Sequence, residues 1–155
     1  MKTSITICCL LMGACAGPST EPAPPEQDPA EASVAPEAPA LPPAWEGAQE
    51  LKSTAGRWTV RWTSTPTPIP ENEPFSLSVW VLDDAGVPAR VELSVDAAMP
   101  EHGHGMNRVP RVERNDSGGF IADGLLFHMP GRWELYFDVT RGPLTERAQL
   151  EVELE

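Results

Sequence analysis

The chain has 155 residues, and its 23 acidic and 11 basic side chains give a formal net charge of −12. This acidity excludes a basic patch for nucleic acid and opposes direct attraction to anionic lipid surfaces, while the length suits one domain of common size. All three cysteines, Cys8, Cys9 and Cys15, lie near the N-terminus. The rest of the chain therefore has no disulfide and no thiolate metal site of the zinc-ribbon or blue-copper kind.

Residues 1–14 are predicted to be a lipoprotein signal peptide. Lys2 precedes an apolar run over residues 5–12, which is too short to remain as a membrane span. Residues 12–15 read MGAC and resemble a bacterial lipobox. In such a motif the cysteine, here Cys15, is lipidated and becomes the new N-terminus. Met12 is less usual than leucine at the first position of that motif. An ordinary signal peptide cleaved near Ala16 is the alternative.

Residues 15–50 are predicted to be the lipidated cysteine and a disordered linker. Nine of the 18 prolines lie in residues 16–44, where acidic residues have no basic counterpart. Such a segment cannot bury enough apolar surface to offset its ordering entropy. At up to ~3.1 Å per residue, an extended linker of this composition would hold a domain several nanometres from a membrane.

Residues 51–155 are predicted to fold into a domain of β-strands. Apolar and polar residues alternate there in short runs, which is the period of a half-buried strand. Turn-forming stretches such as DDAG, NDSGG and RGP separate the runs. The residues expected to face inward are Trp58, Val60 and Trp62; Phe75, Leu77, Val79 and Val81; Val91, Leu93 and Val95; Trp133, Leu135, Phe137 and Val139; and Leu150, Val152 and Leu154.

No run shows a helical stripe of useful length, so the expected fold class is all-β. About seven short alternating strands predict an antiparallel β-sandwich of immunoglobulin-like build. Trp80 departs from the alternation and falls on the face of Ser76 and Ser78. We expect it to cover a sheet edge rather than to contact a ligand.

Histidine and methionine are confined to two short segments of the predicted domain. Strands 90–97 and 120–127 run in the same direction if one strand lies between them, so the loops that follow them are expected to meet at one end. In the second loop, Pro130 and Gly131 suit the central positions of a type II turn. The candidate metal ligands in these loops are Met99, His102, His104, Met106, His128 and Met129.

Imidazole and thioether donors together favour copper, because thioethers prefer Cu(I) and imidazole binds either oxidation state. On an extended backbone His102 and His104 would project to one side, and Gly103 and Gly105 would let the loop curl. Zinc would use the histidines with a carboxylate such as Glu101, and nickel is a third alternative. The same residues could instead only brace a tight loop and fill the core beneath it.

The stretches MPEHGHGM and GGFIADGLLFHMPGRWEL, followed by a closing alternating strand, resemble the YtkA-like domain family. The resemblance covers about residues 56–155. It implies a small exported or membrane-anchored bacterial β-sandwich, often a lipoprotein, in an extracytoplasmic location. The family is mostly uncharacterised, and the association of some relatives with copper handling and oxidase assembly favours a metal role.

The expected function is that of a binding domain in the bacterial cell envelope, anchored to a membrane by lipid and facing the periplasm or the cell exterior. It would bind copper or handle metal as an accessory to copper-transport or oxidase-assembly proteins. The alternative is a structural or interaction module of an envelope assembly that binds no metal. An enzyme is not expected, because the domain has no cysteine nucleophile, no serine in an elbow motif and no phosphate loop.

Overall fold

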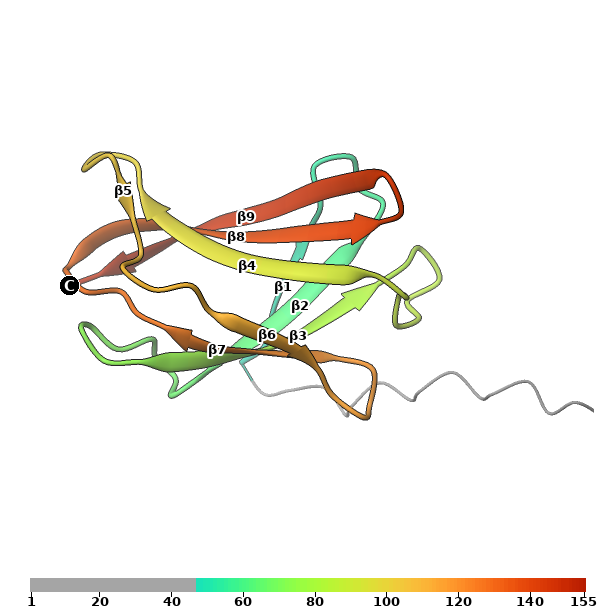
Figure 1. Cartoon of the computed structure of the whole chain (residues 1–155), viewed down its shortest axis with the longest axis horizontal. Coiled ribbons are helices and arrows are strands. Elements are labelled where there is room, and N and C mark those ends of the chain that lie inside the picture. Colours follow the sequence, from blue (N-terminus) through green and yellow to red (C-terminus); the bar gives the residue numbers. More distant parts are fainter. Residues whose placement is uncertain (1–46) are drawn as a thin grey trace, which may run out of the picture. The chain divides into compact units, whose positions relative to one another are not determined.

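The computed structural model describes residues 47–155, and within this range every regular element is a strand (Figure 1). The predicted signal peptide, the lipidated Cys15 and the linker as far as residue 46 lie outside the described residues. The described part contains no helix long and apolar enough to cross a membrane. Its strands are β1 (Gln49–Lys52), β2 (Thr59–Thr65), β3 (Phe75–Leu82), β4 (Glu92–Met99), β5 (His104–Gly105), β6 (Arg111–Arg114), β7 (Phe120–Leu125), β8 (Gly131–Arg141) and β9 (Leu144–Leu154).

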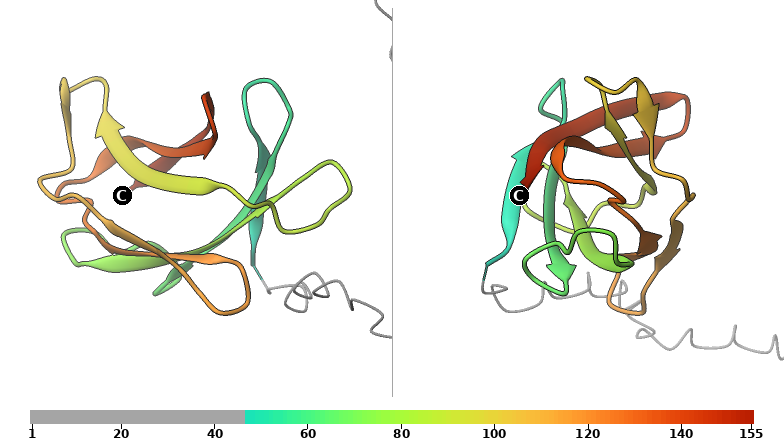
Figure 2. Two further views of the ribbon diagram at one scale, coloured as in Figure 1. Left: turned by 45° about the vertical axis from the view of Figure 1, so that its right-hand side comes forward. Right: turned by 90° about the vertical axis from the view of Figure 1, so that its left-hand side faces the viewer.

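The strands form two antiparallel sheets that face each other (Figure 2). One sheet has the order β1-β2-β3-β7-β6 and the other has the order β5-β4-β8-β9. The predicted antiparallel β-sandwich is therefore confirmed. The prediction of about seven strands missed β1 and β5, because these strands have four and two residues and carry no run of alternating apolar side chains. Strand β1 also begins two residues before the predicted domain boundary at residue 51.

The core lies between the sheets and consists of the inward-facing residues of the alternating runs. Trp133, Leu135, Phe137 and Val139 of β8 are each 0 % exposed, which confirms the predicted orientation of this strand. Each such side chain contributes about 1.5–3 kcal/mol through removal of its apolar surface from water. Other members of the core are Trp58, Val60, Trp62, Phe75, Leu77, Val79, Val81, Val91, Leu93, Val95 and Leu154, whereas Leu150 and Val152 are only partly buried.

Trp80 lies on the outer face of its sheet and is nevertheless only 3 % exposed. A Cβ atom added at Gly119 would lie 2.9 Å from Cε2 of its indole ring. The ring therefore lies directly over the backbone of the residue that precedes β7, where a side chain would have no room. Trp80 therefore covers its sheet as expected, but it does so over the interior strands β3 and β7 and not at a sheet edge.

Glu146 of β9 joins the two sheets at the turn between β1 and β2. Its carboxylate accepts hydrogen bonds from Oγ of Ser53 and from Nε of Arg57, both at 2.7 Å, although the residue is only 7 % exposed. Both hydrogen bonds lower the pKa of Glu146, and the bond from Arg57 has the larger effect. The backbone N–H of Thr54 adds a 2.8 Å hydrogen bond to the carbonyl of Arg147, so the turn is fixed to the opposite sheet.

The pairing of β4 with β8 determines which loops meet. The two strands are antiparallel, with Ala98 opposite Glu134 near one end and Glu92 opposite Thr140 at the other. The loop after β4 and the loop before β8 therefore share one end of the sandwich, at the left of Figure 1. The loop before β4 and the turn after β8 lie at the right-hand end.

Candidate metal site at one end of the sandwich

The first histidine-bearing segment is a tight hairpin between β4 and β5. The carbonyl of Met99 accepts hydrogen bonds from the backbone N–H groups of His102 and Gly103, at 3.1 and 3.0 Å. The chain reverses at Gly103, whose φ of +68° favours glycine. His104 then pairs with Met99 across the short ladder. The prediction of an extended backbone over His102–His104 is therefore wrong, because the two hydrogen bonds to the carbonyl of Met99 require the chain to reverse its direction here.

The second segment runs from β7 to β8 and carries His128 and Met129. The indole N–H of Trp133 donates a 3.0 Å hydrogen bond to the carbonyl of Met129. Gly131 has a φ of +109°, which agrees with the predicted role of the Pro130-Gly131 pair in a turn. The turn and the indole together hold this loop against the first residues of β8.

The three histidine rings of the described domain lie together, with His104 in the middle. The ring centroids of His102 and His104 are 5.8 Å apart, and those of His104 and His128 are 5.2 Å apart. Two imidazoles that share one ion through nitrogen–metal bonds of about 2.0 Å have centroids roughly 5–6 Å apart. The expectation that the two loops meet is confirmed, at a spacing that suits a shared ion.

The environments of the three rings differ. His102 and His104 are exposed, whereas His128 is partly buried between the loop and the core. Nδ1 of His128 is shielded from solvent and has no hydrogen-bond partner within the described residues. Nδ1 of His104 lies 3.1 Å from the carbonyl of Gly105. A buried ring nitrogen without a partner is costly, and a bound ion or a donor would remove that cost.

The three methionines are all at least partly buried, and Met99 is the deepest. Met99 is 1 % exposed and belongs to the core, and a Cβ atom added at Gly131 would lie 3.2 Å from its terminal methyl carbon. Met106 and Met129 are partly buried and pack against the same core. The contacts that the structure establishes for all three methionines are therefore packing contacts with the core.

Trp133 forms the floor beneath the histidines, a role that the sequence did not reveal. Its ring is 5.4 Å from the ring of His128 and 6.2 Å from that of His104, in edge-on geometry for both. Its other face stacks on Phe127 at 4.6 Å with an interplanar angle of 5°. The alternation of β8 identified Trp133 as a core residue, and only its position five residues after His128 hinted at contact with the loop.

Arg132 supplies the main charge interaction beside the hairpin. Its guanidinium donates to Glu101 at 2.8 Å and to Glu151 at 2.9 Å. The negative charge of Glu101, and then that of Glu151, raises the pKa of Arg132. Because Glu101 is held by Arg132, it is less free to serve as the carboxylate that a zinc site would need.

In residues 47–155, no group of three or more histidine, cysteine, aspartate or glutamate side chains is already placed to hold a metal ion. Nitrogen ligation by all three histidines would therefore require rotation of the rings. The exposed positions of His102 and His104, together with the left-handed turn at Gly103, leave room for such a rotation. Thioether sulfur from a neighbouring methionine is the other donor that the cluster offers.

Comparison with known proteins supports the fold and goes no further. No family model matches the sequence, and no curated protein matches it either. Among solved structures, a DUF4426 family protein from Pseudomonas aeruginosa is similar, with a TM-score of 0.52 and 12 % sequence identity. The match covers 70 % of this chain and 94 % of that one. At this identity the similarity shows a shared β fold alone.

Proposed function

We propose that this chain is a copper-binding accessory domain of the bacterial cell envelope, tethered to a membrane by a lipid on Cys15. The observation that carries the proposal is the cluster of His102, His104 and His128, in which a buried ring nitrogen of His128 has no partner. Two loops that are distant in the sequence contribute to this cluster. A bound ion would join them and satisfy the buried nitrogen.

Copper is favoured over zinc by the surroundings of the cluster. Met106 and Met129 flank the histidines in the sequence and are the soft donors that Cu(I) accepts, whereas zinc has little affinity for thioether. Glu101, the carboxylate nearest in sequence, is paired with Arg132. Met99 is the least accessible of the predicted ligands, because it is almost fully buried. It would bind an ion only if the hairpin opened.

The cellular setting is part of the same proposal. The MGAC stretch that ends at Cys15 supports lipidation and an extracytoplasmic location, and the small β-sandwich fold agrees with membership of the YtkA-like family. Copper-transport or oxidase-assembly proteins are the partners that such a domain would serve. The role is one of binding, without a chemical reaction.

Thermal melting of the purified full chain with Cu(I), Cu(II) or Zn(II) tests metal binding. Because an ion binds only the folded state, it should add about 2.7 kcal/mol at a free concentration one hundred times the dissociation constant. The double change His102→Ala and His104→Ala should abolish the copper-dependent rise in melting temperature. His128→Ala alone should weaken it, since this residue supplies the donor from the second loop.

Asn107→Ala is the matched control, because Asn107 is exposed in the same loop and follows Met106 directly. It should leave both the copper response and the stability without metal unchanged. Met106→Leu should reduce the response to Cu(I) more than the response to Cu(II), because Cu(II) depends less on thioether. No rise with any ion for the parent chain would contradict the proposal.

The second candidate is a structural or interaction module whose histidines only shape the two loops. It is favoured by the absence, among residues 47–155, of a group of nitrogen or oxygen ligands already placed for an ion. This candidate predicts no shift with copper and lower stability of the metal-free histidine variants. The same melting series therefore separates the two candidates.

A further inference from the structure

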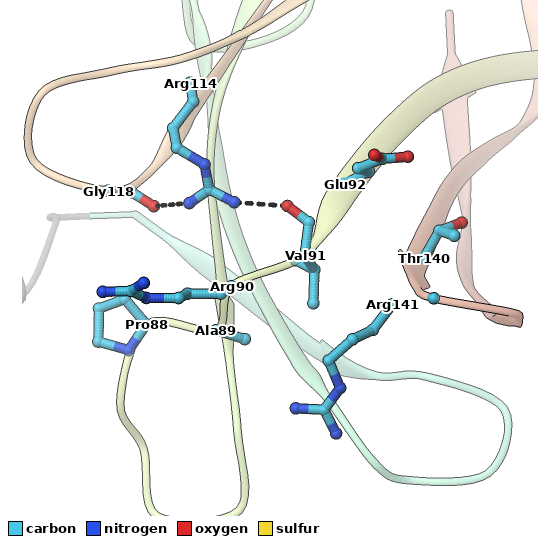
Figure 3. A pocket seen from close by; sticks show the side chains of 10 residues that line it. Pro88, Ala89, Arg90, Val91, Glu92, Arg114, Gly118, Thr140 and Arg141 are labelled. Carbon is cyan, nitrogen blue, oxygen red and sulfur yellow. Dashed lines mark hydrogen bonds between the residues drawn. The ribbon is translucent and has the colours of Figure 1, made fainter.

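A second feature lies at the opposite end of the sandwich from the histidines. It is a pocket of about 640 Å³ lined by the segment before β4, the loop between β6 and β7, and the end of β8 (Figure 3). This volume is typical of sites that hold small ligands. The residues around it are Pro88, Ala89, Arg90, Val91, Glu92, Arg114, Gly118, Thr140, Arg141 and Gly142.

Unpaired positive charge is concentrated at this pocket. Five of the nine arginines in residues 47–155 form ion pairs with carboxylates within that range. The four without such a partner there are Arg90, Arg108, Arg114 and Arg141, and all except Arg108 line the pocket. Glu92 is the one carboxylate among the lining residues. In a domain with an excess of acidic side chains, three arginines left without carboxylates in one place require an explanation.

Arg114 is held rigidly at the wall of the pocket. Its guanidinium donates a 2.8 Å hydrogen bond to the carbonyl of Gly118 and a second hydrogen bond to the carbonyl of Val91. It also lies 4.3 Å from the ring centroid of Phe120. An arginine has five N–H donors, so these contacts fix its position and still leave donors available.

Arg90 and Arg141 lie on either side of the segment that contains Val91, and their guanidinium groups extend in different directions in Figure 3. Both side chains are exposed. Arg141 rests near Trp58, with its guanidinium carbon 5.7 Å from the ring centroid. Arg90 has no hydrogen bond or ion pair within the described residues. Both are therefore able to swing towards a ligand held by Arg114.

We propose that this pocket binds a small organic anion through a phosphate or carboxylate group. Arginine presents paired N–H donors that match two oxygens of either group, and three such side chains around one pocket favour a charge of −1 or −2. Pro88, Ala89 and Val91 provide an apolar wall for the organic part of the ligand. An organic anion should therefore bind more tightly than a bare inorganic one.

Calorimetric titration of the full chain with phenyl phosphate, succinate and inorganic phosphate tests this site. Phenyl phosphate should bind more tightly than inorganic phosphate, and comparison with succinate shows which anionic group is preferred. Arg90→Gln and Arg141→Gln should each weaken the tightest probe by about tenfold or more, as expected for loss of hydrogen bonds to a charged group. Arg90→Gln should leave the melting temperature unchanged, since no described contact depends on that side chain.

Arg108→Gln is the matched control, because Arg108 is also exposed and lacks an ion pair within the described residues but lies outside the pocket. It should retain the affinity of the parent chain. Absence of binding for all three probes, or an equal loss in Arg108→Gln, would overturn the proposal. The double change His102→Ala and His104→Ala should leave anion binding intact, so failure of the metal proposal and failure of this one are distinguishable.

Discussion

Tyr136 is the single tyrosine of the chain, and its ionisation can therefore be followed without ambiguity. Its hydroxyl donates a 2.7 Å hydrogen bond to Glu134, and the guanidinium carbon of Arg147 lies 4.4 Å from its ring centroid. Burial, and then the hydrogen bond to Glu134, raises the pKa of Tyr136 to about 12. An ionised phenolate would lose this hydrogen bond and face the negative carboxylate.

We expect an absorbance titration of the folded protein to give a phenol midpoint near 12, against about 10 in denaturant. Glu134→Gln should lower the folded midpoint, because it removes the neighbouring negative charge. Since the folded pKa is raised, the stability that Tyr136 contributes is present below about pH 10 and is lost as the pH rises through about 12. A midpoint near 10 with the circular dichroism of the fold intact would contradict this.

The sequence supports two interpretations of the role of Met99. Its place beside His102 suggested a ligand, but it also continues the inward series Val95 and Ala97 of β4, all of which are buried. The period-two pattern could therefore have identified it as a core residue. Trp133 shows the reverse case, since the alternation revealed its burial and nothing in the pattern revealed its contacts with histidine rings.

At the scale of elements, the strands were predictable and the contacts between the sheets were not. Long alternating runs such as that of β8 dictate one buried face, and the Pro130-Gly131 pair marks the bend at which this strand begins. The alternation of β9 puts Glu146 on the inward face with Leu150 and Val152, but it does not show which residues accommodate a carboxylate there. Its partners are more than 80 residues away, and only the folded chain brings them together.

The link from Glu146 to the β1–β2 turn should make stability depend on pH. The hydrogen bonds from Arg57 and Ser53 lower the pKa of Glu146 below its ordinary value of 4.5. The stability from this link is therefore present above about pH 4.5 and is lost as the pH falls through the lowered pKa of the folded state. Glu146→Gln should melt at a lower temperature at pH 7 and show a smaller further loss in acid.

Thermal melting of the parent and of Glu146→Gln between pH 7 and pH 3 measures this dependence. Glu153→Gln is the control, because Glu153 is exposed on the same strand and forms no ion pair within the described residues. It should follow the parent chain at each pH. If the difference in melting temperature between the parent and Glu146→Gln does not shrink towards pH 3, the assignment of this pH dependence to Glu146 is wrong.

For the whole molecule, the two candidate sites differ in how far the sequence revealed them. The proposed metal ligands are clustered along the chain, so counting residue types was enough to suggest them. Arg90, Arg114 and Arg141 are separated by 24 and 27 positions and come from the segment before β4, the end of β6 and the end of β8. No local sequence pattern marks these three arginines. They stand out only in the folded structure, where, among the described residues, most of the other arginines have carboxylate partners and these three do not.

Strand β8 is paired along its length with β9 and over most of its length with β4. The histidine cluster lies at one end of β8 and the arginine pocket lies at the other. The eight residues of β4 separate these ends by about 23 Å, which exceeds the ~8 Å Debye length at physiological ionic strength. A copper ion and an organic anion should therefore bind with a coupling free energy near zero. The affinity for phenyl phosphate should agree within about twofold with and without saturating copper, as expected if the two proposed ligands load independently of each other.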